Sequence, residues 1–275
     1  RVLPKQFGNY YGKKVFEIEQ VCVGTNTMSY ESYLNCRNFS FILQLLSASI
    51  FSPIYKLTQK LGISWHEVVK KTADLIKTKN FKGKFKDLYI EFCTEAENEL
   101  FESREEAIEF YKKEENYQLL LKGDIGENLL GKYGAKGFFV HKDIMTTLFK
   151  VIKIIFNSNY DKDFVIILNS SEKWLNNLYM IDEIMSHEDN IKNNVYEIDL
   201  DFDFPSWLLD TNQPIENFKK YSIYKTDLNQ KKINYLKNEI KSIYTDDKLR
   251  ALGRYFRQHM QRGQSVFERE YQKIQ

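Results

Sequence analysis

Residues 24–46 read GTNTMSYESYLNCRNFSFILQLL and lead from an extended segment into a helical region. Ser29 stands where a helix N-cap is expected, and Glu31 follows it near the positive end of the helix dipole. Side chains then recur at helical spacing, at Tyr33, Leu34, Arg37, Phe41 and Leu45. The stretch therefore predicts a long helix that opens at Ser29, and the rest of the chain is organised around it.

The composition allows a full hydrophobic core. The chain has 275 residues, 43% of them hydrophobic, which suits one large domain or two modest ones. Lys and Arg number 40 against 38 Asp and Glu, so the net charge of +2 gives no electrostatic argument for nucleic acid as a partner. The longest apolar stretch, Phe39–Phe51, is too short to span a bilayer, and we expect no membrane partner.

Cysteine usage indicates a reducing compartment. Cys22, Cys36 and Cys93 are an odd number at wide spacing, which matches neither a disulfide framework nor a metal knuckle. Reduced thiols in the cytoplasm are expected. The chain begins at Arg1 without a charged and then apolar leader, so we expect a fragment rather than a precursor with a signal peptide.

The first 28 residues predict one strand. Arg1–Tyr11 reads as an irregular lead-in, and Lys14–Val23 has the alternating, β-branched pattern of a strand. A lone strand needs sheet partners, so we expect them from residues preceding Arg1 or from later strands of this chain.

Residues 29–159 predict a helical array with short connections. Ser64–Glu67 and Ser103–Glu106 have the spacing of capping boxes. The expected helices after the first are Ser64–Lys79, Phe85–Glu102, Glu105–Tyr111 and Ala135–Phe156, with a further helical run over residues 122–131.

Residues 160–275 predict a small α/β subdomain with a basic helical tail. The expected elements are a strand at Phe164–Leu168, a helix at Ser171–Met185, strands at Val195–Phe204 and Tyr221–Lys225, a helix at Leu228–Tyr244 and a helical tail at Asp246–Gln275. The predicted fold class is α+β and predominantly α-helical: an N-terminal strand and helical array, followed by this subdomain and tail.

Four acidic residues alternate along one strand, at Glu197, Asp199, Asp201 and Asp203. They could form a metal or acid/base surface, but calcium loops need a turning backbone with Gly at fixed offsets. We favour the solvent face of an antiparallel strand, charged against edge pairing.

Other chemistry-bearing residues are isolated. The histidines lack the paired spacing of zinc helices, so we favour surface or capping roles for His66, His141, His187 and His259. The glycines of KGDIGE (122–127) and GKYGAKG (131–137) follow no strand, and they indicate helix ends and tight helix contacts.

Arg37 and the arginines of the C-terminal tail could make specific contacts. Arg37 could reach a buried carboxylate or a cofactor carboxylate, and we favour a structural salt bridge. The tail could present a basic aromatic helix to RNA or a protein, although a solvated face is favoured. Its residues are Arg250, Arg254, Tyr255, Phe256, Arg257, Arg262 and Arg269.

Several blocks together resemble one family. They are RVLPKQFG (1–8), VGTNTMSYESY (23–33), CRNF (36–39), FESREEA (101–107), GENLL (126–130) and DFDFPSWL (201–208). This combination resembles the C-terminal region of cobalamin-binding-type radical S-adenosylmethionine proteins, downstream of their catalytic barrel.

The resemblance implies that the chemistry lies outside this chain. In that family a Cys-x3-Cys-x2-Cys motif in the barrel binds a four-iron cluster that cleaves S-adenosylmethionine, and a separate N-terminal domain binds cobalamin. This chain has no such cysteine triplet, so no cluster ligand and no cobalamin site is transferred to it. For the full-length protein the resemblance implies a 4Fe-4S cluster and S-adenosylmethionine, and it leaves cobalamin open.

The first hypothesis is therefore an accessory, substrate-access region that is catalytically silent alone. Val15–Val23 would be the last strand associated with an upstream barrel and Thr25–Phe39 the exit helix, with Thr25 and Arg37 nearest the barrel edge. The alternative is a stand-alone helical module whose basic tail binds RNA or a protein. It predicts binding that weakens with salt and depends on Arg254 and Arg257.

Overall fold

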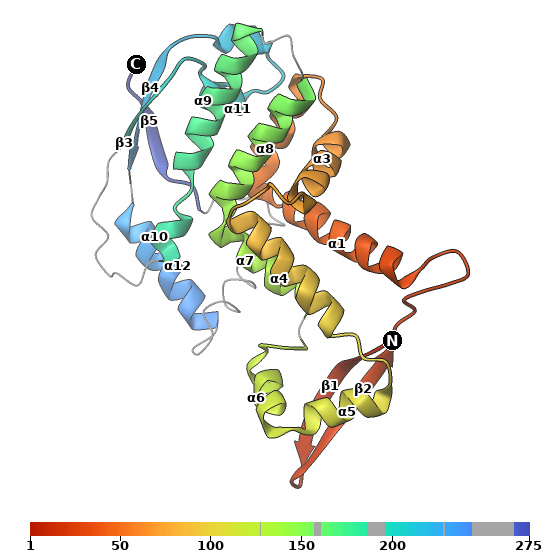
Figure 1. The fold of residues 1–275 in the computed structure, drawn as a ribbon. Coiled ribbons are helices and arrows are strands. Elements are labelled where there is room, and N and C mark those ends of the chain that lie inside the picture. The colour runs from red at the N-terminus through yellow and green to blue at the C-terminus, as the bar shows by residue number, and fades with distance from the viewer. Residues whose placement is uncertain (127, 157–160, 186–195, 228, 244–266) are drawn as a thin grey trace.

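Helices form most of the chain in the computed structural model, together with two small antiparallel sheets (Figure 1). The structure describes residues 1–126, 128–156, 161–185, 196–227, 229–243 and 267–275. Within these ranges the predicted class, α+β and predominantly helical, is confirmed. The domain limits predicted at residues 28 and 159 stay predictions.

The chain opens with a β-hairpin rather than a single strand. Strand β1 (Val2–Tyr10) pairs antiparallel with β2 (Lys13–Gln20). Tyr11 and Gly12 form the turn with φ of 50° and 79°, and positive φ at both central residues matches the twist of the strands. The irregular lead-in predicted for residues 1–11 was wrong, and these residues supply the partner that the predicted strand needed.

Helix α1 (Tyr30–Leu46) forms where the sequence predicts it. Ser29 Oγ accepts a hydrogen bond from the Ser32 amide at 3.1 Å, which confirms the N-cap. The C-terminal half of the helix buries Phe41, Ile42, Leu45 and Leu46. α1 thereby becomes the helix against which α3, α4 and α7 pack.

The helical array continues to residue 156. Its elements are η1 (Ser49–Phe51), α2 (Ser52–Lys60), α3 (Trp65–Lys77), α4 (Lys84–Asn98), α5 (Arg104–Lys112), α6 (Glu114–Lys122), α7 (Leu129–Phe139) and α8 (His141–Phe156). Ser103 caps α5 as predicted, whereas the Ser64 side chain makes no cap hydrogen bond to α3. The single helix predicted over residues 135–156 is two helices, because the backbone leaves helical geometry at Val140 (φ −116°, ψ 16°).

The strand predicted at residues 164–168 was wrong. These residues lie inside α9 (Lys162–Leu178), which Asp161 caps by accepting from the Asp163 amide. The buried positions of this helix recur mostly three and four residues apart, at Phe164, Ile167, Leu168, Ser170, Ser171, Trp174, Leu175 and Leu178. The five apolar residues are therefore one part of a longer helical stripe.

The second sheet lies at the C-terminal end of the chain. Its order is β3–β4–β5, all antiparallel, and α9 packs beside β3 (Figure 1). The elements after α9 are α10 (Ile181–Met185), β3 (Tyr196–Leu200), α11 (Phe204–Leu209), η2 (Ile215–Phe218), β4 (Ser222–Asp227), α12 (Gln230–Ile243) and β5 (Glu270–Lys273). The helical tail predicted to residue 275 was wrong at its end, where β5 pairs with β4.

Buried apolar side chains form two clusters. The larger runs through the helices and the second sheet, from Phe41 to Phe267. The smaller comprises Phe16, Tyr111, Tyr117 and Leu120, and it joins β2 to α5 and α6. Phe7 of β1 packs edge-on against Tyr117 of this cluster. We call these four elements the hairpin lobe and the remaining described elements the main body; Figure 1 shows the lobe at the lower end.

Within the described ranges, no single helix is long and apolar enough to cross a membrane. Tyr30–Leu46 and Ser49–Lys60, bent by 68° relative to each other, meet the length and composition criteria only as a pair.

Candidate functional site

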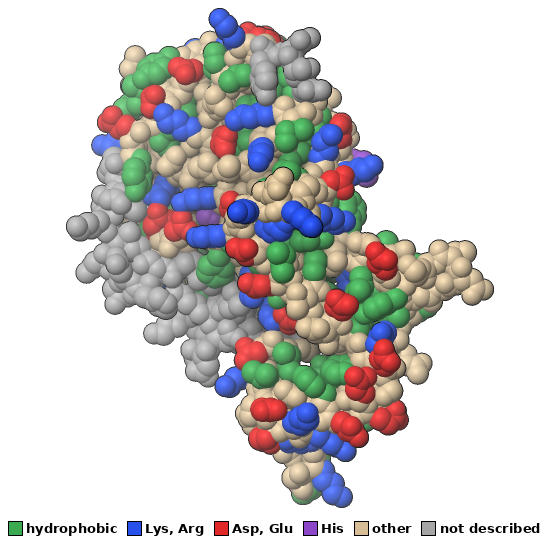
Figure 2. All heavy atoms as spheres, in the orientation of Figure 1, with side chains coloured by type: hydrophobic (Ala, Val, Ile, Leu, Met, Phe, Trp, Pro, Cys, Tyr) green, Lys and Arg blue, Asp and Glu red, His purple; other side chains and the backbone are tan. Residues whose placement is uncertain are grey.

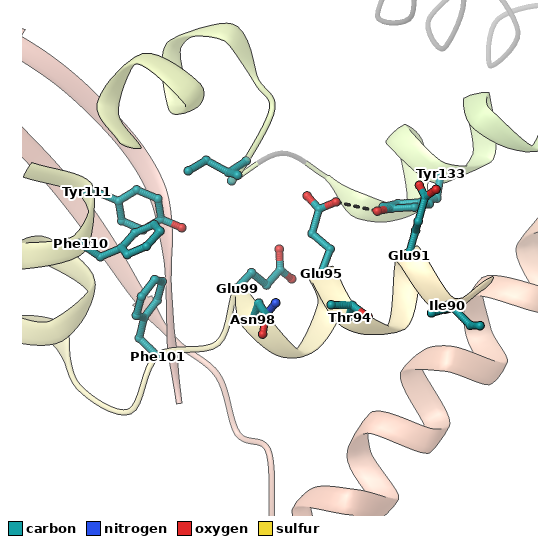
Figure 3. Close-up of a pocket in the computed structure, with 12 residues that line it drawn as sticks. Ile90, Glu91, Thr94, Glu95, Asn98, Glu99, Phe101, Phe110, Tyr111 and Tyr133 are labelled. Atoms are coloured by element: carbon teal, nitrogen blue, oxygen red, sulfur yellow. Dashed lines mark hydrogen bonds between the residues drawn. The ribbon is translucent and has the colours of Figure 1, made fainter. Parts of the chain in front are cut away.

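A pocket of about 490 Å³ lies where the hairpin lobe meets the main body (Figure 3). Figure 2 shows hydrophobic side chains gathered between the two parts, with acidic side chains beside them. Helix α4 forms one side of the pocket, α5 the opposite side, and the α6–α7 connection and α7 complete it. The lining residues are Ile90, Glu91, Thr94, Glu95, Asn98, Glu99, Phe101, Phe110, Tyr111, Ile125, Gly126 and Tyr133.

Three carboxylates line the pocket along one face of α4 and its C-cap residue, Glu99. Glu91, Glu95 and Glu99 are four residues apart, so the helical repeat places them one above another. Like charges at this spacing repel each other, which destabilises a helix unless cations lie nearby. The fold supplies one cation to each carboxylate.

The cations come from α1 and α7. Arg37 forms an ion pair with Glu99 and donates a second hydrogen bond to the Ala96 carbonyl at 2.9 Å. Lys132 Nζ contacts both Glu95 oxygens at 2.7 and 2.8 Å. Lys136 pairs with Glu91 at 2.8 Å. The charges around the pocket are therefore balanced by direct contacts.

Tyr133 ties α7 to the middle carboxylate. Its hydroxyl donates to Glu95 Oε2 at 2.7 Å (Figure 3). Its ring packs edge-on against Phe41 and Phe92, whose rings stack with centroids 4.2 Å apart. Because Phe41 and Phe92 belong to the main core, the position of Glu95 is fixed from two sides.

Aromatic rings form the opposite wall. Phe101, Phe110 and Tyr111 lie with ring centroids 5.1–5.5 Å apart. Val2 and Phe101 exchange two backbone hydrogen bonds of 2.9 Å, which attach this wall to the first strand of the hairpin. Packing between aromatic edges and faces orients the rings and leaves apolar surface toward the pocket.

Two glycines shape the connection over the pocket. Gly123 ends α6 in the left-handed conformation, with φ of 74°. Gly126 has φ of 73°, and a Cβ there would lie 3.1 Å from Leu120 Cδ1. Both conformations favour glycine, and Gly123 marks a helix end as predicted for this segment. The helical run predicted over residues 122–131 was wrong at residues 123–126, which follow the end of α6 and are not helical.

Burial changes the acidity of the groups in the pocket. It raises the pKa of Glu99 above its ordinary value of 4.5; the Arg37 ion pair opposes this rise, and the negative charge of Glu95 adds to it. Burial likewise raises the pKa of Tyr111, and the charges of Glu99 and Glu95 add to the effect. At neutral pH the tyrosine is therefore a neutral hydroxyl facing two carboxylates.

This arrangement suits recognition of a ligand. An apolar wall faces a row of hydrogen-bonding groups across a space of ligand size. Among the described residues, no group of three or more His, Cys, Asp or Glu side chains is arranged to hold a metal ion.

The predicted contact residues are divided between this site and the rest of the chain. Arg37 lies at the site, and the structural salt bridge favoured for it is confirmed by its pairing with Glu99. Thr25 lies apart, in an exposed turn where its Oγ1 accepts from the Thr27 and Met28 amides. Arg254 and Arg257 lie outside the described residues. The barrel-edge and tail contacts therefore stay predictions.

One arginine of the predicted tail is described and is not solvated. Arg269 is buried and forms an ion pair with Glu183 of α10, and its amide donates to the Leu178 carbonyl at 2.8 Å. The solvated face favoured for the tail is wrong at this position, because the chain turns into the sheet here. The other named tail residues lie outside the described ranges.

The acidic strand face is confirmed for Glu197 and Asp199; Asp201 is exposed just beyond the end of the strand, and the prediction is wrong for Asp203. Glu197, Asp199 and Asp201 are exposed. Asp203 is fully buried, because β3 ends at Leu200 and the alternation ends with it. Its side chain caps α11.

The histidines differ in their surroundings. His66 is exposed at the start of α3, which confirms the surface role favoured for it. His141 is buried, so a surface role is wrong, but its Nδ1 lies 2.6 Å from the Phe138 carbonyl at the end of α7, in keeping with a capping contact. His187 and His259 lie outside the described residues.

The carboxylates of the pocket had a signal in the sequence that was overlooked. Four-residue spacing of Glu91, Glu95 and Glu99 within a predicted helix indicates one acidic face. Tyr111 and Tyr133 carry no comparable signal, because tertiary packing alone brings them to α4.

Comparison of the chain with protein-family models, curated proteins and solved structures gave no match.

Proposed function

We propose that this chain is the C-terminal accessory region of a radical S-adenosylmethionine enzyme, where it binds part of the substrate beside the catalytic barrel. The observation that carries the binding role is the pocket between α4 and α5, which this chain forms from its own side chains. The resemblance of the sequence blocks supports the radical enzyme as the setting. Alone, the region is catalytically silent.

The cysteines of this chain do not fit an iron–sulfur cluster. Cys22 and Cys36 are exposed, Cys93 is half-buried in α4, and all three are free thiols. Their sequence spacing also differs from the family motif. The 4Fe-4S cluster, S-adenosylmethionine and any cobalamin therefore belong to the barrel and its companion domain in this proposal.

The hairpin supports a role beside another domain. Within the described residues, β1 and β2 pair with each other and form one further bridge, between Val2 and Phe101. The hairpin also exposes Tyr10, Tyr11 and Val15. Unpaired strand edges are surfaces on which another chain segment can add. In the proposal, this hairpin and the segment containing Thr25 face the barrel.

The proposal places the protein in the cytoplasm. Three free thiols, two of them exposed, suit a reducing compartment.

Assays of S-adenosylmethionine cleavage test the proposed role. The chain alone, treated anaerobically with iron, sulfide and dithionite, is expected to form no more 5′-deoxyadenosine than a protein-free control. The polypeptide from the complete reading frame is expected to form it. Turnover by the isolated chain, or none by the complete polypeptide, would contradict the proposal.

A pocket variant of the complete polypeptide tests the binding part. Tyr111→Phe is expected to raise KM for the substrate severalfold and change kcat little, because the hydroxyl binds and does no chemistry. Equal loss of kcat and kcat/KM would contradict a binding role.

A further inference from the structure

The Tyr111 hydroxyl has no hydrogen-bond partner among the described residues. Tyr111 is 2% exposed, and its ring packs against Phe16, Phe101 and Phe110. Figure 3 shows the hydroxyl pointing from α5 into the pocket, toward Glu95 and Glu99. The hydroxyl oxygen is not completely buried, so it is accessible from the pocket, where water or a ligand can form a hydrogen bond with it.

Glu99 offers an acceptor to the same space. One of its carboxylate oxygens pairs with Arg37, and the other has no hydrogen-bond partner in the described part of the chain. The side chain is 11% exposed and lines the pocket. A donor placed between Glu99 and the Tyr111 hydroxyl would therefore satisfy two groups at once.

The charges around this point favour a cation over an anion. Arg37, Lys132 and Lys136 are held by Glu99, Glu95 and Glu91. An anionic ligand would meet the carboxylates of α4 and would have to break these pairs to find a cation. A cationic donor meets the second Glu99 oxygen directly, and the aromatic rings opposite can also attract it.

The rest of the pocket lining favours a ligand whose remaining part is apolar. Phe101, Phe110, Ile125 and Ile90 line the pocket around the polar end. Its volume of about 490 Å³ falls within the range typical of small-molecule sites. One aromatic ring with a short side chain would bury its apolar surface here and keep its charged end beside α4.

We propose that the pocket binds a primary ammonium group carried on an aromatic body. The ammonium donates to the free Glu99 oxygen and to the Tyr111 hydroxyl oxygen, and the body packs against Phe101 and Phe110. This names the ligand class of the site in the proposed function and rests on that function only for the identification of the ligand as substrate. Binding itself requires no barrel, cluster or S-adenosylmethionine.

Calorimetric titration of the 275-residue chain with three matched probes tests this inference. The probes are 2-phenylethylammonium, 2-phenylethanol and 3-phenylpropionate, which share a ring and a short linker and differ in the charge of the end group. The ammonium is expected to bind with a dissociation constant of about 1 mM, as its small size allows. The alcohol and the carboxylate are each expected to bind at least about tenfold more weakly. Neither can donate a charged hydrogen bond to Glu99, and the loss of such a bond weakens binding by about tenfold or more.

Variants locate the binding. Glu99→Gln is expected to weaken ammonium binding about tenfold or more, and Tyr111→Phe, which keeps the ring, about fivefold. Glu97→Gln removes an exposed carboxylate of the same helix outside the pocket lining, so it controls for net charge and is expected to leave binding unchanged. Circular dichroism checks folding, and Tyr111→Phe decides the outcome if Glu99→Gln does not fold.

Three results would overturn the inference. The first is equal affinity for the alcohol and the ammonium, and the second is no binding at ammonium concentrations up to about ten times the expected dissociation constant. The third is that Glu97→Gln weakens ammonium binding as much as the pocket variants do. None of these results would contradict the proposed radical-enzyme function; each would mean that the pocket binds a different class of ligand. Conversely, ammonium binding by a chain whose complete reading frame lacks a barrel would keep this inference and remove the proposed function.

Discussion

Asp203 shows how one buried charge can join distant parts of this chain. It receives hydrogen bonds from Lys273 Nζ at 2.6 Å, the Tyr224 hydroxyl at 2.6 Å and the Ser206 amide at 3.4 Å. Burial favours the protonated acid, but these donors outweigh it and hold the pKa of Asp203 below its ordinary value of 3.8. The carboxylate thereby fixes β5 and β4 to the start of α11.

Replacing Asp203 by Asn is expected to lower the free energy of unfolding by about 2–3 kcal/mol, because the Lys273 pair is lost and buried donors lose their charged acceptor. Asp199→Asn on the neighbouring strand is the control. Its exposed pair with Lys173 is expected to contribute less than about 1 kcal/mol. Urea unfolding measures both, and equal effects would show that burial of Asp203 adds nothing.

At acidic pH, the wild type and Asp203→Asn are expected to have the same free energy of unfolding. A depressed pKa stabilises the fold above the unfolded-state pKa and ceases to do so as pH falls through the folded-state value. The difference in unfolding free energy is therefore expected to be constant near neutral pH and to shrink below about pH 3.8. A difference that persists below both pKa values would assign the effect of the substitution to something other than charge.

At the residue scale, the sequence predicts patterns better than exceptions. It predicts the exposed face of β3 and the pairing of Arg37 with a carboxylate. It does not predict that Asp203 turns inward, because that depends on where β3 ends. The row of pocket carboxylates could have been predicted from spacing; the Tyr111 hydroxyl opposite could not, because it reaches the site through tertiary packing.

At the scale of elements, α7 illustrates a close helix contact. A Cβ on Gly137 would collide with Leu45 Cδ1 of α1, whereas one on Gly134 would meet nothing within 4 Å. Both glycines lie in α7, and Gly137 is buried. Alanine substitutions at the two positions therefore distinguish the effect of helix propensity on stability from the effect of packing.

Gly137→Ala is expected to destabilise the protein by about 1–3 kcal/mol, because Leu45 is buried and must move. Gly134→Ala is expected to stabilise it by up to about 1 kcal/mol through helix propensity alone. Thermal or urea unfolding measures the pair. Stabilisation by both substitutions would contradict the close α1–α7 contact.

Element prediction succeeds where capping and periodicity agree. The α1 start at Ser29 and the α5 start at Ser103 are both confirmed by side-chain hydrogen bonds. Residues 164–168 were predicted as a strand because the run is apolar and β-branched, and the helical stripe that includes it was not recognised. The first strand was predicted without its partner, because residues 1–10 lack clear alternation.

At the scale of the molecule, the described chain has two hydrophobic clusters of unequal size. The hairpin lobe depends on four fully or nearly buried side chains, whereas the main body has a far larger cluster. The pocket lies between the two parts and takes residues from both. Local stability of the lobe therefore bears directly on the site.

Phe16→Ala is expected to remove about 3–5 kcal/mol of local stability from the lobe. Hydrogen exchange should then speed up in β1, β2, α5 and α6 and change little in α3 and α8, because the lobe can open separately. Exchange measured by mass spectrometry distinguishes this from uniform loss of protection, which would indicate one cooperative unit.

Sequencing the coding region upstream of the Arg1 codon tests the central claim most directly, because the proposed accessory role requires a radical S-adenosylmethionine barrel. The account predicts an in-frame Cys-x3-Cys-x2-Cys motif within the preceding few hundred codons. An in-frame stop codon before any such motif would contradict it.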